Sequence, residues 1–418
     1  MKSIILITSL LFAVSSKSAI FQVNLTNFDG VDANPGNGIC KIPGNDFCTL
    51  RAAVMEANAL PGNDIIVLPG DALIELTIEG SGEGSATTGD LDITDNLTIG
   101  SFTEPVESFP TVSALGINDR VFEVGFGAGN VTFVNFKIIN GDANTNSQNG
   151  GGIRINAFNE VEVLSVWFQD NVAESGGAIY VNGSSQLSVH NSVFRANAAT
   201  DTGAAISSIG NTSISQSTFF EHVNLNGIQE ETLYITHAPK VGAGLMEVRN
   251  STLFNNNGSA IYSRGGRIVV NNSTLVDNGR FGLLATGGPF ATRALIRNTV
   301  FNNNDLSDCS VIDDVTVDDV DNHNMSSNIS CLNGGSTNLI GDPKLSEMRI
   351  DADGWHRYFR PNLNSPLVDS ASPTDPGFIG ACEVEDQLGL IRADDGGAQC
   401  DRGAIELSSD IIFFNGFL

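Results

Sequence analysis

Residues 187–197 read L-S-V-H-N-S-V-F-R-A-N, and this pattern occurs seven times along the chain. The copies align on one large apolar residue, which we call the anchor. The anchors are Ile138, Phe168, Phe194, Phe219, Leu253, Leu275 and Phe301. Successive anchors are 30, 26, 25, 34, 22 and 26 residues apart, and repeats of this length indicate the stacked coils of a solenoid.

The positions before each anchor alternate as in a strand with one buried face. Five residues before the anchor every copy is apolar: Phe133, Val163, Val189, Ile214, Val248, Val270 and Ile296. Seven residues before it only one copy is polar: Val131, Val161, Leu187, Thr212, Met246, Ile268 and Ala294. An antiparallel sandwich or barrel also has short strands at regular spacing. It would not return the same residue type to the same place in every unit. Parallel coils would, because each residue lies about 4.8 Å above its counterpart.

The alternation breaks three residues before each anchor, which predicts a sharp bend. Asparagine occupies the bend in five copies, and serine or glutamine in the other two: Asn135, Ser165, Asn191, Gln216, Asn250, Asn272 and Asn298. Asparagine is the non-glycine residue that best tolerates left-handed backbone angles. We also expect these amides to hydrogen-bond one another along the stack.

Two short motifs accompany the anchors. F-x-x-N occurs at residues 168–171, 194–197, 254–257 and 301–304, and a cluster of small residues precedes isoleucine at 150–153, 176–179, 203–206 and 258–261. The chain thus resembles the pectate-lyase-like right-handed parallel β-helix. It is most similar to bacterial surface proteins with polymorphic-outer-membrane-protein-type repeats. The resemblance implies an all-β fold, with a short N-terminal capping helix and a small C-terminal closing region.

Residues 1–19 carry one early lysine, a short apolar stretch and then small residues. The apolar stretch is too short to span a bilayer as a helix, so the segment is expected to be a cleaved secretory signal peptide. A buried first strand is the alternative. Nothing later in the sequence resembles a transmembrane helix.

Residues 20–64 are predicted to form an N-terminal cap. Helical spacing relates four apolar residues, with Thr49 as N-cap and Pro61 beyond the end: Leu50, Ala53, Val54 and Ala57. Such a helix would cover the apolar end of the first coil and block edge pairing. Residues 48–66 resemble the CSLREA domain, although alanine stands where that family usually has Glu. Asp90 and Asp92 could bind a cation, but turn residues are the preferred interpretation.

Residues 65–345 are predicted to form the β-helix, residues 346–407 a separate C-terminal segment, and residues 408–418 a tail. N-S-P-L-V-D-S-A at 364–371 and D-R-G-A-I-E at 401–406 resemble the choice-of-anchor Q domain. The tail is either a tag for export or surface attachment or a final strand.

The six cysteines lie beyond the signal segment in three close pairs: Cys40 and Cys48, Cys309 and Cys331, Cys382 and Cys400. Export and an even count favour disulfides between these neighbours. Zinc is disfavoured, because no C-x-x-C occurs and the histidines are scattered.

Two kinds of loop could bind ligands. Repeats longer than the shortest one, of 22 residues, are expected to carry loops that project from the stack, where binding usually occurs. Residues 141–149 and 224–241 are the candidates. Residues 311–324 hold five aspartates. Calcium is one interpretation of this segment and a solvated acidic loop the other, preferred one; the sequence identifies neither cofactor nor metal site.

The net charge of −27 argues against nucleic acid, anionic membranes and polyanionic glycans as partners. Together with the signal-like residues 1–19, this charge fits an exported protein, which we expect to be extracellular or on the bacterial cell surface or outer membrane. Its partner would be an unknown extracellular ligand, with a neutral glycan or a cell-surface component as the candidates.

Two functions compete on this scaffold. The preferred one is a non-catalytic, adhesin-like or matrix-like binding or structural protein; the alternative is a polysaccharide lyase or glycoside hydrolase. A hydrolase needs two carboxylates roughly 5–9.5 Å apart. Two residues beyond the anchor, Asp170 and Glu221 are the candidate pair, yet they fall in alternate coils, about 10 Å apart, with Ala196 between them. No catalytic site is therefore expected.

Overall fold

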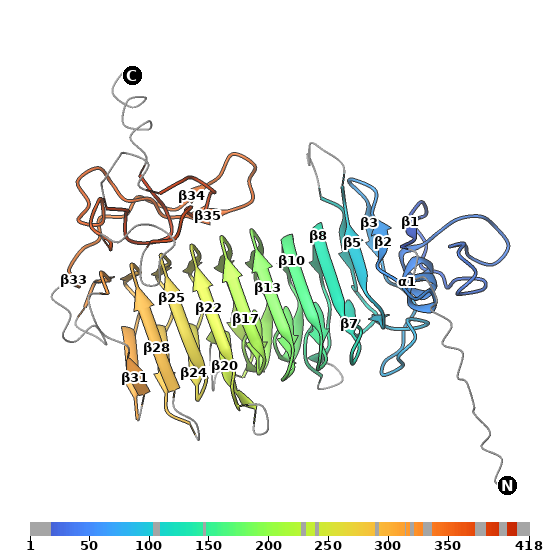
Figure 1. The fold of residues 1–418 in the computed structure, drawn as a ribbon, viewed down its shortest axis with the longest axis horizontal. Helices are drawn as coiled ribbons and strands as arrows, with labels where there is room; N and C mark the ends of the chain where they lie inside the picture. Colours follow the sequence, from blue (N-terminus) through green and yellow to red (C-terminus); the bar gives the residue numbers. More distant parts are fainter. Residues whose placement is uncertain are drawn as a thin grey trace, which may run out of the picture.

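The computed structural model describes residues 18–102, 109–144, 148–226, 231–238, 242–288, 292–313, 315–317, 322–328, 337–372, 382–392 and 399–407. It confirms the predicted fold class, because successive windings of the chain form an all-β parallel β-solenoid (Figure 1). No helix in these ranges is both long and apolar enough to cross a membrane.

Successive windings contribute strands to three faces, and the paired strands within each face run parallel to one another. The first face contains β1 (Ile20–Gln22), β2 (Asp64–Val67), β5 (Leu97–Gly100), the starts of β8 (Asn130–Ile139) and β10 (Glu160–Gln169), β13 (Gln186–His190), β17 (Asn211–Ser215), β22 (Leu245–Arg249), β25 (Arg267–Asn271), β28 (Thr292–Arg297) and β31 (Val315–Val317). The second contains β3 (Leu73–Glu75), β6 (Thr111–Ser113), the ends of β8 and β10, β14 (Val193–Arg195), β18 (Thr218–Phe220), β23 (Thr252–Phe254), β26 (Thr274–Val276), β29 (Val300–Asn302), β32 (Met325–Ser326) and β33 (Leu339–Ile340).

The third face contains β4 (Leu91–Ile93), β7 (Phe122–Val124), β9 (Ile153–Ile155), β12 (Ile179–Val181), β16 (Ile206–Ser208), β20 (Glu231–Ala238), β24 (Ser259–Arg264), β27 (Phe281–Thr286) and β30 (Ser307–Ile312). A smaller sheet holds β11 (Val172–Ser175), β15 (Ala198–Thr202) and β19 (Val223–Asn224). Antiparallel pairs are β20 with β21 (Gly242–Ala243), and β34 (Arg349–Ile350) with β35 (Arg357–Tyr358).

The predicted vertical stacking of equivalent residues from successive coils is confirmed. Each anchor is paired in register with the next, and all seven are fully buried. Val163, Val189 and Ile214 are likewise vertical neighbours. The rings of Phe168, Phe194 and Phe219 stack with centroids 4.7 and 4.5 Å apart. Like side chains therefore fill one continuous core.

The predicted bend is confirmed, since all seven bend residues have positive φ, between 43° and 57°. The bonding predicted between bend residues along the stack is present from Asn191 Nδ2 to the Ser165 hydroxyl of the adjacent coil. Three other bend amides donate instead to backbone carbonyls of the C-terminal segment: Gln216, Asn250 and Asn272.

The amide ladder lies at a second corner, just beyond the anchors. Asn171 donates to Asn197, and beyond His222 the series resumes from Asn256 to Asn278 and from Asn278 to Asn304; all these amides are buried. The residues immediately before them also have positive φ. Asp170 and Glu221 are among these preceding residues, which form an outer row along the corner. The left-handed backbone explains why short polar side chains are frequent in this row.

The capping helix is confirmed as α1 (Leu50–Ala59), with the Thr49 side chain accepting a hydrogen bond from the Ala52 N–H. It packs on β2 and β4 at one end of the stack (Figure 1). Its four predicted apolar residues join the main core. The sheet itself begins within the predicted cap, because β1 pairs with β2.

The C-terminal segment lies along the side of the stack (Figure 1). Its hydrogen bonds reach the solenoid from His356 to Asn191, from Arg392 to Asn250 and from Arg402 to the Asn324 carbonyl. The segment thus spans several windings along the corner formed by the bend residues, which we call the first corner.

Two predicted disulfides, Cys40–Cys48 and Cys382–Cys400, are confirmed. Cys309 is also disulfide-bonded, whereas its predicted partner Cys331 lies outside the described residues. Most of the predicted signal peptide and the whole tail lie outside them too, as do parts of both long loops and of the aspartate-rich segment.

Candidate functional site

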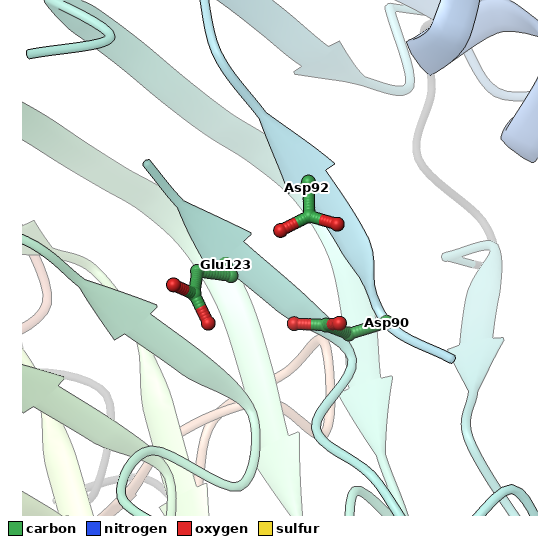
Figure 2. A group of neighbouring side chains, drawn as sticks. All are labelled: Asp90, Asp92 and Glu123. Carbon is green, nitrogen blue, oxygen red and sulfur yellow. The ribbon is translucent and has the colours of Figure 1, made fainter. Parts of the chain in front are cut away.

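Three carboxylates meet near the N-terminal end of the stack (Figure 2). Asp90 precedes β4, Asp92 lies within it, and Glu123 lies on β7 directly in register with Asp92. One oxygen of each lies within 4.8 Å of the others. Leu91 and Ile93 point into the core, so strand alternation directs Asp92 to the outer side of the sheet. Sequence reasoning named Asp90 and Asp92 but missed Glu123.

Arg120 supplies the positive charge of this group. Its Nη1 lies 3.1 Å from Asp90 Oδ2, 2.5 Å from Glu123 Oε2 and 3.9 Å from Asp119 Oδ1. The Arg120 side chain is buried, and its Nη2 donates to Gln148 Oε1. A buried carboxylate is tolerated only when it is paired, so Arg120 offsets part of the cost of burying Asp90.

Further hydrogen bonds fix the carboxylates. Asp92 Oδ2 accepts from the Ala86 N–H at 3.1 Å, and Glu123 Oε1 accepts from Asn156 Nδ2 at 2.6 Å. Arg154 Nη1 lies 3.8 Å from Glu123.

Burial raises the pKa of Asp92 from 3.8 to about 7. The Ala86 N–H opposes this shift, and the charges of Glu123 and Glu83 add to it. Burial also raises the pKa of Asp90 well above its usual value, against the opposing charge of Arg120. The pKa of Asp119 is raised for the same reasons. At neutral pH the group therefore carries less negative charge than its composition suggests.

Among the described residues, Asp90, Asp92 and Glu123 are the group close enough to share a metal ion. A hard cation such as Ca²⁺ would need more oxygen ligands than these three side chains supply singly. Arg120 already contacts two of them. The chemistry of the group fits an internal, charge-compensated polar cluster better than a metal centre.

Asp92 makes stability depend on pH. Between about pH 4 and pH 7 the folded chain holds a proton on Asp92 that the unfolded chain has released, so this contribution to stability falls as pH rises through that window. Asp92→Asn imitates the protonated form. We expect its free energy of unfolding, relative to wild type, to rise from pH 4 to pH 7 and then level off, as measured by urea denaturation.

The comparison between variant and wild type matters because His222 and His356 act in the opposite direction. Burial lowers their pKa values to about 3 and about 4. As pH falls, the unfolded chain therefore binds these protons first, and the stability of the folded chain decreases. Asp46→Asn, at an exposed position, is the matched control. A difference for Asp92→Asn that stays constant or falls over this range would contradict the assignment.

The predicted pair Asp170 and Glu221 lies elsewhere, on the outer row of the second corner. Asp170 accepts a hydrogen bond from Gln169, and Glu221 forms a 2.8 Å ion pair with Arg195. The backbone of Ala196 lies between their coils, since Asp170 donates to the Arg195 carbonyl and Ala196 to the Phe220 carbonyl. The backbones of the two residues are therefore two strand spacings apart along the stack, about 10 Å.

No protein-family model matches the chain, and no curated protein matches it in sequence. Pectate lyase Pel9A is similar in structure with a TM-score of 0.44 and 17% identity, over 95% of this chain and 98% of that one. A rhamnogalacturonan lyase gives 0.41 and 11%, over 84% and 96%. The chain is a parallel β-solenoid. Likeness at this level does not extend to a site or a substrate, and the resemblances to the CSLREA and choice-of-anchor Q domains stay predictions.

Proposed function

We propose that this chain is an exported, non-catalytic β-solenoid scaffold that binds an extracellular ligand or cell-surface component. One observation carries the proposal: of the three acids that the fold brings closest together, Asp90 and Glu123 are paired with Arg120, and Asp90 and Asp92 are buried. A general acid or base must reach a substrate. Asp90 and Asp92 are 1% and 4% exposed, so they are poorly placed for such contact.

The disulfides support export. Such bonds persist in oxidising compartments and are rare in the cytosol, and Cys40–Cys48 ties the loop before α1 to the start of that helix. The signal-like residues 1–19 and the strongly acidic composition are consistent with the same destination.

Rigidity supports a scaffold role. The solenoid is held by stacked rings, by a buried amide ladder and by a C-terminal segment bonded across several windings. Such a rod presents surface groups at fixed spacing, which suits binding or assembly.

The expected outcome for wild-type protein is binding without turnover. It would be incubated with neutral and acidic polysaccharides, with and without Ca²⁺, and reducing ends and unsaturated products would be measured. We expect neither product. Turnover that Asp170→Asn or Glu221→Gln abolishes, with folding unchanged by circular dichroism, would contradict the proposal and favour the polysaccharide-active alternative.

A further inference from the structure

Two exposed aromatic rings lie side by side at the corner that follows the third face. Phe126 comes after β7 and Phe158 after β9, the next strand in the stack. They are 73% and 61% exposed, yet their rings contact each other edge to face with centroids 5.2 Å apart. Phe126 is the most exposed large apolar side chain among the described residues.

The backbone of Phe158 indicates that this ring is not there for folding. Its φ is +69°, in the left-handed region that bulky residues avoid. The in-register positions of the neighbouring coils hold Gly127 (φ +68°) and Ser184 (φ +67°), which suit such a corner better. A phenylalanine in this region that buries little surface gains little free energy to offset the backbone strain, and outliers of this kind concentrate at functional sites.

The two turns are locked together. Asn159 accepts from the Gly129 N–H and donates to the carbonyls of Gly125 and Asn156. The Gly127 N–H donates to the Ala157 carbonyl, which ties the two coils directly. The ring pair is therefore preorganised, and a ligand would lose little free energy in ordering it.

We infer that Phe126 and Phe158 form a binding platform for a neutral saccharide. A pyranose ring has an apolar C–H face that packs on an aromatic ring and a rim of hydroxyls that needs polar neighbours. Asn130, exposed at the start of β8, offers an amide four residues from Phe126. The inference rests on the proposed function, for which it supplies the ligand class.

Other occupants fit less well. Single-stranded nucleic acid also stacks on aromatic rings but requires a positive groove, whereas this chain has a net charge of −27 and Glu160 is exposed beside Phe158. A second copy would need about 800 Å² of contact per partner. Two phenylalanines supply at most about 150–250 Å² each.

The test is affinity electrophoresis of the full chain in gels containing laminarin, hydroxyethyl cellulose or mannan, with polygalacturonate as the charged comparison. We expect at least one neutral polysaccharide to retard wild-type protein and polygalacturonate not to. Phe126→Ala and Phe158→Gly should each weaken binding about tenfold, and Phe158→Tyr should retain it. Leu115→Ala, a 69% exposed apolar side chain on another turn, should leave binding unchanged.

Phe158→Gly separates binding from folding. It relieves the left-handed strain, so its denaturation midpoint should rise while its binding weakens. The platform is refuted if no neutral polysaccharide retards the protein, if both variants bind like wild type, or if binding disappears in about 1 M salt, where the Debye length is about 3 Å. Self-association in analytical ultracentrifugation that the variants abolish would refute it in favour of a second copy. Cleavage of a bound polysaccharide would instead contradict the non-catalytic function and leave the platform standing.

Discussion

Phe194→Ala is expected to destabilise the protein by about 3–5 kcal/mol, the usual cost of removing a fully buried phenylalanine. Phe194 has no exposed surface and stacks on Phe168 below and Phe219 above, with interplanar angles of 8° and 11°. Truncation leaves a cavity that neither neighbour can fill, because both are held in register by backbone pairing. Each of them also loses a ring contact.

The measurement is guanidinium denaturation followed by the fluorescence of Trp167 and Trp355, the two tryptophans of the chain. Trp167 lies on β10, in the coil next to Phe194. Phe126→Ala is the matched control, since the same substitution at a 73% exposed site should change stability by no more than about 0.5 kcal/mol. If both variants lost equally little, the anchor column would not be a close-packed core.

Arg120→Met is expected to cost about 3–5 kcal/mol at neutral pH, because it leaves buried acids without their counter-charge. The guanidinium contacts Asp90 and Glu123, and Met fills a similar volume without charge. The loss should shrink in mild acid, where carboxyls whose pKa values are already raised by burial take up protons. Urea denaturation at pH 5 and pH 8 would measure both effects.

Arg195→Met provides the control, since Arg195 also pairs with a carboxylate, but its side chain is 40% exposed and that of Glu221 42%. Exposed pairs of this kind contribute about 0–1 kcal/mol. Adding Asp90→Asn and Glu123→Gln to Arg120→Met should recover part of the lost stability. An Arg120→Met protein as stable as Arg195→Met at pH 8 would mean that the acids are neutral without Arg120.

The core could be predicted because its signal is periodic. Val163, Val189 and Ile214 recur at one phase of each repeat, and parallel coils turn that recurrence into vertical contact. The bend at Asn191 and the helix start at Thr49 were also predictable, since each depends on local backbone chemistry that one residue type satisfies. The sequence alone does not show which corner carries the buried amide ladder, because asparagine tolerates the bend at both and only packing decides which amides face inward.

The stacking of the coils, the capping helix and the disulfides Cys40–Cys48 and Cys382–Cys400 could be read from the amino-acid sequence alone, because each follows from repetition or from short-range geometry. Only the tertiary structure brought Arg120 and Glu123 to Asp90, laid the C-terminal segment along the first corner and set Phe158 beside Phe126. These contacts join residues from coils of unequal length or from distant parts of the chain. No local pattern encodes them, and they arise only when the register of every winding is fixed by the core.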